Sequence, residues 1–233
     1  MDYRDRHVVV TGGAGALGTA VVRALVARGA HCHVPYRSET AAQRFALREH
    51  PQVTLAAVGN LADEAAVARL YDGVPRLWAS IHAAGGFAAA PLAATNKSEL
   101  MAQLDMNFIS CFLCCRAAVN AIARSGEGGR IVNVAARPAL EWRAGAGMAA
   151  YGASKAAVAA LTAALAEEVA KDGILVNAVA PSIMDTAANR AAMPKADHAA
   201  WPKVEEVAAT IAFLASPDNR VARGGVIPVY GRS

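Results

Sequence analysis

The sequence predicts a single α/β domain, residues 1–233, with a doubly wound parallel sheet of seven strands and helices on both faces. Short and nearly continuous apolar runs alternate with longer alanine-rich stretches, which is the pattern of buried parallel strands joined by crossover helices. No stretch rich in Pro, Gly or Ser divides the chain, so we expect one domain.

Seven apolar runs are expected to form the strands of this sheet. They are Val8–Thr11, His31–Pro35, Val53–Val58, Leu77–His82, Arg130–Ala135, Ile174–Val179 and Val226–Val229. The stretches between them are expected to be helical. They are Leu17–Arg28, Ala41–Glu49, Glu64–Tyr71, Ser98–Arg124, Ala149–Lys171 and Val204–Ala215.

The composition favours a folded protein that binds small molecules. Hydrophobic residues make up 55% and charged residues 18%, so a large core is expected and disorder is not. The net charge of +4 fits an anionic cofactor or substrate, but ordinary surface composition explains it equally well. Lys and Arg are scattered singly, so no basic stripe for nucleic acid is expected.

The N-terminal segment is charged and has no apolar signal region. No apolar stretch approaches the roughly 20 residues that a membrane helix needs, so we expect a cytoplasmic protein with no membrane partner.

Three of the four cysteines share one face of the helix expected at 98–124. They are Cys111, Cys114 and Cys115, and Cys32 lies in a strand. A metal site needs further ligands at suitable spacing, and none are close in sequence. We therefore expect buried apolar cysteines and no metal.

A glycine-rich turn follows the first strand directly and opens the first helix. It reads Thr11-Gly12-Gly13-Ala14-Gly15-Ala16-Leu17-Gly18. Glycine allows a tight turn and close approach of a pyrophosphate, whose charge the helix N-terminus favours. Between a first strand and a first helix, such a turn predicts dinucleotide binding.

These residues resemble the glycine turn of the short-chain dehydrogenase/reductase family, with Ala16 in place of its middle glycine. Further motifs match in order along the chain: Asn60-Leu61, Ala84-Gly85, Asn107, Tyr151-x-x-x-Lys155, Asn177-x-x-x-Pro181 and Thr186. The resemblance spans Val8 to Gly231. It implies a Rossmann-type fold, an NAD(P)-dependent oxidoreductase, and cofactor contacts from the glycine turn and from Asn60, Leu61, Ala84, Gly85, Lys155, Pro181, Ile183 and Thr186.

The end of the second strand decides the expected cofactor. An acidic residue there would bind the adenosine ribose and repel a 2′-phosphate, and none is present. Arg37 is able to pair with that phosphate instead, with help from Ser38. We expect NADP (as NADPH), with NAD possible. Asn60 is expected to hydrogen-bond the adenine edge, or alternatively to cap the next helix.

Tyr151 and Lys155 are four residues apart and share one helix face. By the family resemblance, Tyr151 exchanges the proton, and the Lys155 ammonium, with the oxidised nicotinamide, lowers the phenol pKa from its usual value near ~10. Lys155 also holds the nicotinamide ribose. The resemblance makes Asn107 the third catalytic residue, because it anchors a water near the lysine.

The chain departs from the family where a serine normally follows the fifth strand. Ala136 stands at that place, and no serine lies between Ser125 and Ser154. Losing such a hydrogen bond costs a rate factor on the order of 10²–10³. Ala136, Trp142 and Met184 are candidate substrate contacts.

Dihydropteridine reductases within this family also lack the serine, and the chain resembles them in three segments. These are the turn at 13–18, Ala84-Gly85-Gly86-Phe87, and Asp185-Thr186-x-x-Asn189-Arg190-x-x-Met193-Pro194-x-Ala196-Asp197 with Trp201. The resemblance implies reduction of a conjugated or imine-like heterocycle such as a dihydropterin.

Other functions stay open from the sequence. One is a general carbonyl reductase or alcohol dehydrogenase in which water or Arg137 replaces the serine. Others are a non-catalytic dinucleotide-binding sensor, and a lyase or isomerase on the same scaffold. By family resemblance, the long apolar helices predict a homotetramer or homodimer.

Overall fold

The strands of the computed structural model, which describes all 233 residues, form one sheet in the order β3-β2-β1-β4-β5-β6-β7. Every neighbouring pair is parallel, so the predicted seven-stranded parallel sheet is confirmed. The strands are β1 His7–Thr11, β2 His31–Tyr36, β3 Val53–Ala57, β4 Leu77–His82, β5 Gly129–Val134, β6 Ile174–Pro181 and β7 Val226–Val229.

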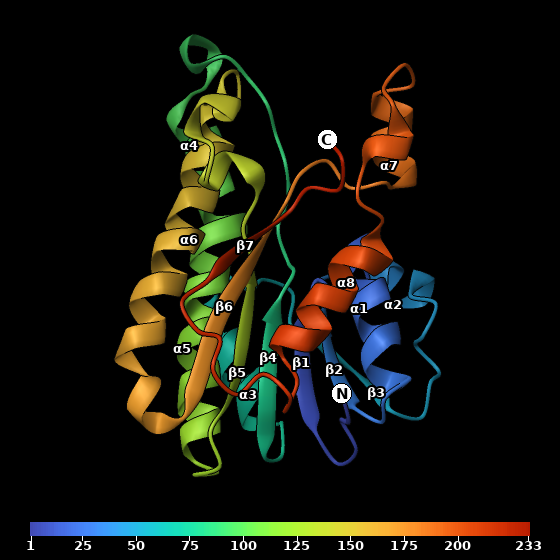
Figure 1. Ribbon diagram of the computed structural model, residues 1–233, viewed down its shortest axis with the longest axis vertical. Helices are drawn as coiled ribbons and strands as arrows, with labels where there is room; N and C mark the ends of the chain where they lie inside the picture. Colours follow the sequence, from blue (N-terminus) through green and yellow to red (C-terminus); the bar gives the residue numbers. More distant parts are fainter.

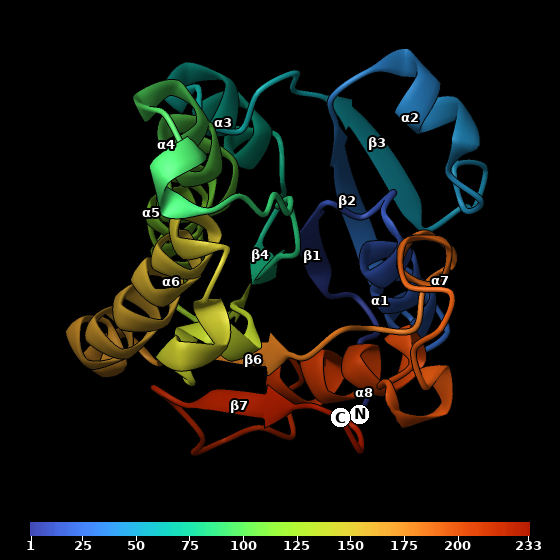
Figure 2. The same ribbon diagram turned by 90° about the horizontal axis from the view of Figure 1, so that it is seen from above.

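Helices cover both faces of this sheet (Figures 1 and 2). Helices α1 (Ala16–Val26) and α8 (Val204–Leu214) pack on one face and share an apolar core with β1, β2 and β4. Helices α3 (Glu64–Asp72), α5 (Ser110–Ala123) and α6 (Ala149–Glu168) form a second core on the other face. Because both faces are buried, the strands read as continuous apolar runs.

Two helices differ from the prediction. The helix expected at 98–124 is three segments: α4 (Lys97–Leu104), a π-helical turn (Asp105–Ile109) and α5. Helix α2 (Glu39–Arg44) is shorter than expected, because Phe45 turns into extended backbone and buries its ring in the core. A short helix, α7 (Ala187–Ala192), was not expected and stands beyond the sheet (Figure 1).

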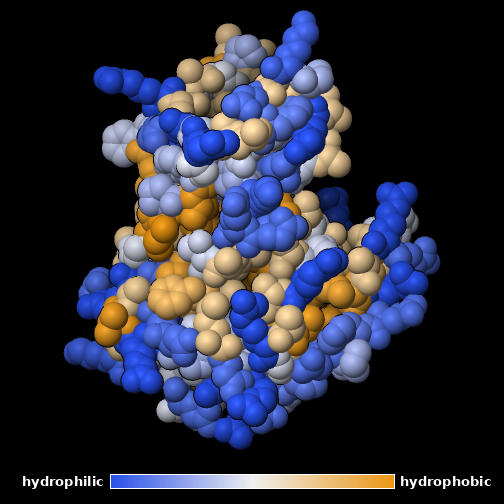
Figure 3. Space-filling model, turned by 45° about the vertical axis from the view of Figure 1, so that its right-hand side comes forward, coloured by the Kyte–Doolittle hydropathy of each residue, from blue (hydrophilic) through white to orange (hydrophobic).

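The expectation that no helix is long enough for a membrane was wrong. Lys97–Ala123 and Ala149–Glu168 are both long and apolar enough by length and composition. Small apolar residues on one side of each helix pack on the sheet, which accounts for part of this composition. On the surface seen in Figure 3, hydrophilic side chains surround separate apolar patches.

The sheet positions the functional residues at its carboxyl edge. Strands β1 and β4 are neighbours, and the chain leaves them toward opposite faces. At such a switch point the connections diverge, and α/β proteins bind ligands in the crevice between them.

Candidate active site

The glycine turn after β1 is joined to the end of β4. The Ala84 N–H donates to Thr11 Oγ1 at 3.2 Å, and the Ala83 N–H donates to the Thr11 carbonyl oxygen at 3.2 Å. Gly12 has a φ of 66°, and a Cβ there would lie 2.6 Å from the Ala84 nitrogen. Only glycine therefore permits this close approach of the two strand ends.

Helix α1 begins without a side-chain cap. Its N-cap is Gly15, whereas the side chains of Ser38, Asp63, Asn96 and Thr186 cap α2, α3, α4 and α7. Gly15 and Ala16 are also exposed. The first N–H groups of α1 are therefore free for an external acceptor, and they fit the pyrophosphate of a dinucleotide.

The end of β2 carries a cation without an internal partner. Arg37 is exposed and makes no ion pair or hydrogen bond within the chain. The Ser38 oxygen accepts from the Ala41 N–H at 3.3 Å, so this side chain caps α2 while its own proton stays available.

Asn60 does not cap a helix. Its Oδ1 accepts from the Ala62 N–H at 3.0 Å, and the cap of α3 is Asp63. That alternative was wrong, because α3 begins only at Glu64 and its N-cap lies three residues after Asn60. Asn60 is exposed, and Leu61 packs against the core beside it.

Asn107 is the centre of a buried hydrogen-bond network in the π-helical turn. Its Oδ1 accepts from the Gly86 N–H at 2.9 Å, and its Nδ2 donates to the Gly86 carbonyl at 3.1 Å and to Ser154 Oγ at 3.1 Å. The residue is 1% exposed. Single π turns occur frequently at functional sites, and this one aims the amide at the segment after β4.

Lys155 lies next to this network. Its Nζ donates to the Val134 carbonyl at 2.8 Å, and a Cβ on Gly85 would lie 3.3 Å from Nζ and 2.7 Å from Asn107 Oδ1. The sequence-predicted residues Asn107, Lys155 and Gly85 are therefore brought together. Burial lowers the pKa of Lys155 to about 8.

Tyr151 opens α6 one turn before Lys155. Its ring meets Phe87 edge to face at 5.0 Å between centroids. The hydroxyl makes no hydrogen bond within the chain, and no buried polar side-chain atom lacks a partner, so this hydroxyl reaches open space. Burial raises the pKa of Tyr151 to about 12. In the protein alone this is opposite to the expected lowering, because burial disfavours the charged phenolate.

The end of β5 holds no hydroxyl group. Ala136 is 5% exposed and begins a short turn at Arg137–Ala139. Arg137 Nε donates to Glu141 Oε2 at 2.7 Å, and its guanidinium lies 5.1 Å from the centroid of the Tyr230 ring. Arg137, which the sequence suggested as a replacement for the serine, is thus already paired with Glu141.

The segment after β6 carries the remaining predicted contacts. Pro181 is buried at the strand end, Ile183 is 44% exposed, and Met184 packs against the core. Thr186 Oγ1 caps α7 by accepting from the Asn189 N–H at 3.2 Å.

Trp142 lies apart from these residues on the surface. Its side chain is 80% exposed and lines an open cavity of about 750 Å³ with Pro138, Gly152 and Ala153. Its role in substrate binding stays a prediction.

Two parts of the site were missed from the sequence. Ser154 joins Asn107 to α6, because its Oγ accepts from Asn107 and donates to the Tyr151 carbonyl at 2.7 Å. Gly86 forms two further hydrogen bonds with Asn107, through its N–H and its carbonyl oxygen. Both residues adjoin predicted site residues, since Ser154 precedes Lys155 and Gly86 follows Gly85. Their contacts with Asn107 could not be predicted, because they arise only when separate segments fold together.

The fold and these side chains together define an oxidoreductase of the dinucleotide-binding α/β type. The chain belongs to the short-chain dehydrogenase family, whose model matches residues 6–197. This confirms the family resemblance, although none of the comparisons points to dihydropteridine reductases in particular.

Curated relatives match nearly the whole chain. Galactitol 2-dehydrogenase of Rhizobium johnstonii is 33% identical over 96% of this chain and 93% of its own. A Mycobacterium tuberculosis hydroxy-methyl-oxo-hexahydroindene-carboxyl-CoA reductase is 36% identical over 95% of this chain and 90% of its own. The 3beta-hydroxysteroid dehydrogenase 1 of Eggerthella lenta is 32% identical over 99% and 94%.

Solved structures share the fold. A short-chain type dehydrogenase/reductase from Mycobacterium ulcerans superposes with a TM-score of 0.88 at 25% identity, covering 100% of this chain and 90% of the other. ElxO, solved with NADP bound, superposes with a TM-score of 0.87 at 23% identity, covering 97% of each chain.

Proposed function

We propose that this protein is an NADP(H)-dependent reductase whose substrate accepts hydride without help from a serine hydroxyl. The glycine turn, the uncapped N-terminus of α1 and the free Arg37 support NADP(H). A guanidinium pairs well with a 2′-phosphate. The first carboxylate after β2 is that of Glu39, which accepts a hydrogen bond from the Tyr36 hydroxyl at 2.9 Å. ElxO, with its bound NADP, provides a structural precedent.

Tyr151 is the proton donor in this proposal. When bound, NADPH supplies the hydride. The phenol, protonated because burial raises its pKa to about 12, gives its proton to the substrate atom that gains negative charge. Lys155 stabilises the resulting phenolate and holds the nicotinamide ribose. Asn107 holds the 85–86 segment in place through its paired hydrogen bonds to Gly86.

The substrate class rests on one observation, the alanine at position 136. A ketone oxygen that becomes an alkoxide benefits strongly from a second hydrogen-bond donor. A conjugated or imine-like heterocycle, such as a dihydropterin, spreads the added charge through its ring. Its reduction therefore needs one proton donor, which Tyr151 supplies.

A substrate panel with the purified protein tests this proposal. NADPH oxidation is followed with a quinonoid dihydropterin, a cyclic imine, a cyclic ketone and a sugar ketone at equal concentrations. We expect turnover with the heterocycles at a kcat/KM at least about tenfold above that of the ketones. Fast turnover of ketones alone would disprove the substrate class while leaving NADPH dependence intact.

The names of the relatives favour a second candidate, a general carbonyl reductase or alcohol dehydrogenase. In this candidate, water or Arg137, whose Nε pairs with Glu141 at the surface, would take the place of the serine. The same panel distinguishes it, and NADPH binding without turnover of any substrate would instead favour a sensor.

We also propose a homotetramer or homodimer. Apolar side chains on the outer side of the 97–123 segment are partly exposed, and their burial between subunits would be favourable. They are Leu100, Met101, Met106 and Phe112, at 36% to 43% exposure. Sedimentation of the purified protein measures the oligomeric state.

A further inference from the structure

A buried cluster of metal-binding side chains lies between the sheet and α5. His82 ends β4, and Asn133 is its direct neighbour on β5. Cys111 and Cys115 are one turn apart on α5, which packs over these strands. The four residues are between 0% and 5% exposed. The cysteines have no further ligand close to them in the sequence, but the fold brings His82 to them from 29 residues before Cys111.

Four donor atoms of this cluster surround one point. His82 Nδ1 lies 3.4 Å from Cys115 Sγ and 4.0 Å from Cys111 Sγ. Asn133 Oδ1 lies 2.8 Å from His82 Nδ1, and 3.3 and 3.4 Å from the Sγ atoms of Cys111 and Cys115. The ligand atoms of His82 and the two cysteines all lie within 4.8 Å of one another.

These separations match those around a tetrahedral zinc ion. Bonds of about 2.3 Å to sulfur and about 2.0–2.1 Å to nitrogen or oxygen give edges of roughly 3.5 Å between sulfur and nitrogen and roughly 3.4 Å between nitrogen and oxygen. Two of the separations must change appreciably: the distance from His82 to Asn133 must lengthen from 2.8 Å, and that from His82 to Cys111 must shorten from 4.0 Å. Small side-chain rotations therefore suffice to admit the ion.

Neighbouring residues fix the direction of both non-sulfur ligands. Asn133 Nδ2 donates to Thr162 Oγ1 at 2.9 Å, and that hydroxyl donates to the Val158 carbonyl at 2.8 Å. The Thr162 oxygen thus acts as an acceptor, which holds the Asn133 oxygen toward the sulfurs. His82 Nε2 lies 2.8 Å from Ser80 Oγ, which can accept a hydrogen bond from the Nε2–H group when Nδ1 binds a metal.

We propose that His82, Cys111, Cys115 and Asn133 form a structural site for a thiophilic divalent cation, Zn²⁺. On binding, the two thiols lose their protons to solvent, and the His82 ring proton moves from Nδ1 to Nε2. Two thiolates and Zn²⁺ leave the buried site neutral. With no open coordination position, the ion joins β4, β5 and α5 and takes no part in the reaction.

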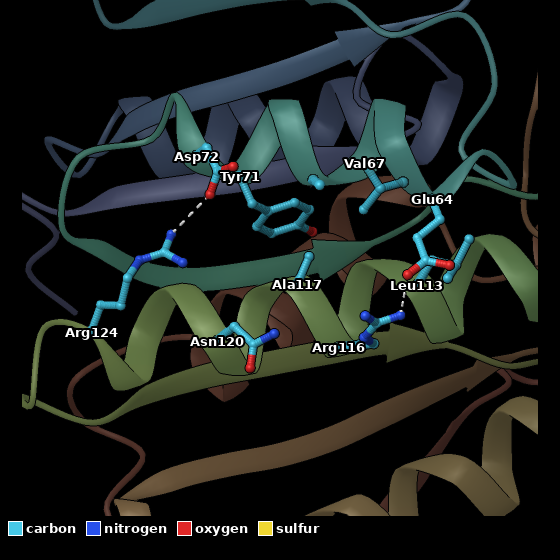
Figure 4. A pocket seen from close by; sticks show the side chains of 10 residues that line it. Glu64, Val67, Tyr71, Asp72, Leu113, Arg116, Ala117, Asn120 and Arg124 are labelled. Atoms are coloured by element: carbon cyan, nitrogen blue, oxygen red, sulfur yellow. Dashed lines mark hydrogen bonds and ion pairs between the residues drawn. The ribbon is translucent and has the colours of Figure 1, made fainter.

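Tyr71 separates this site from a groove on the outer side of α3 and α5. Figure 4 shows the Tyr71 ring in this groove between the two helices, with the ion pairs Arg116–Glu64 and Arg124–Asp72 on either side of it. The Tyr71 hydroxyl lies 3.3 Å from His82 Nε2. The folded protein is thus closed to an ion, so uptake occurs during folding.

Refolding with a metal tests the proposal independently of activity. The full chain is unfolded in denaturant with a chelator, the chelator is removed, and the chain is refolded with Co²⁺ as a spectroscopic substitute for Zn²⁺. We expect about one Co²⁺ per chain, with the thiolate charge-transfer absorption and intense visible bands of a tetrahedral centre, and its displacement by Zn²⁺.

Paired variants locate the ligands. Cys111→Ser with Cys115→Ser removes both sulfurs, and we expect loss of the charge-transfer band. Cys32→Ser with Cys114→Ser is the matched control, because these cysteines are equally buried and lie outside the cluster, and it should keep the band. No band in the unaltered protein, or an equal band in the first pair, would overturn the site.

A milder variant covers the case in which the first pair does not fold by circular dichroism. Thr162→Val keeps all four ligands and removes the Thr162 hydroxyl, with its hydrogen bond from Asn133 and its local one to the Val158 carbonyl. Loss of such outer contacts lowers metal affinity by about 10–100-fold. An unchanged affinity in this folded variant would contradict the proposed role of Asn133.

Discussion

The proposed cofactor side and the proposed substrate side of the site are built from different parts of the chain. On the cofactor side, main-chain groups of the glycine turn and the buried network of Thr11, Asn107 and Lys155 hold the geometry. On the proposed substrate side, the Ala136 side chain offers no polar atom, and Trp142 is exposed on a connecting segment. The cofactor side therefore does not depend on the identity of the substrate, whereas residues on the substrate side can change without altering cofactor binding.

The largest effect is expected from Tyr151→Phe. Removing the phenol removes the proposed proton donor, and general acid catalysis contributes a rate factor of about 10²–10⁴. We expect this loss in kcat for NADPH oxidation while the Kd for NADPH changes little. Activity within a few-fold of the unaltered protein would show that another group donates the proton, and Tyr151 would then not connect the cofactor side to the substrate.

Gly85→Ala tests how rigidly the cofactor side is held. The new Cβ would lie 2.7 Å from Asn107 Oδ1, so the amide and its neighbour Lys155 must move. A displacement of about 1 Å in a catalytic group costs a rate factor of about 10². Gly73→Ala is the control, since its Cβ would meet only ordinary contacts of 3.5 and 3.6 Å. Equal kcat in the two variants would show that Asn107 is not held as described.

Arg37→Glu tests which dinucleotide the cofactor side selects. A carboxylate at this position repels the 2′-phosphate, and we expect the Kd for NADPH to rise by about 30-fold, or about 2 kcal/mol, with little change for NADH. Arg44→Glu carries the same charge change at the end of α2, where it is exposed and unpaired. Titration by nucleotide fluorescence measures both, and a similar loss in the control would indicate a general charge effect.

The pH profile of reduction tests Lys155. Its pKa in the folded protein is about 8, below the usual value, so the ammonium is lost as the pH rises through 8. Because kcat/KM reports the free enzyme, we expect a plateau below that pH and a fall of about tenfold by one unit above it. A profile still flat above about pH 9 would contradict the need for a charged lysine.

Much of the cofactor side could be predicted from the sequence because it depends on local patterns. Glycines between a strand and a helix, and the Tyr151-Lys155 spacing, are visible without the fold. The π-helical turn at Asn107 was not visible, since its residues fit an ordinary helix equally well. The approach of His82 to two cysteines was not visible either, because it depends on contacts between β4 and α5.

The smallest effect, and the sharpest test of the substrate side, is expected from Ala136→Ser. If the substrate is a conjugated heterocycle, a hydroxyl here has no developing alkoxide to stabilise, and kcat/KM should stay within about threefold. If the substrate is a ketone, the same hydroxyl supplies the missing hydrogen bond, and the rate should rise by up to about 10². Ala135→Ser is the matched control, because Ala135 also follows β5 but packs into the core on the α5 face. A large rise with ketones in Ala136→Ser alone would therefore reject the heterocycle proposal, because it would mean that the site is an ordinary carbonyl site limited by its missing serine.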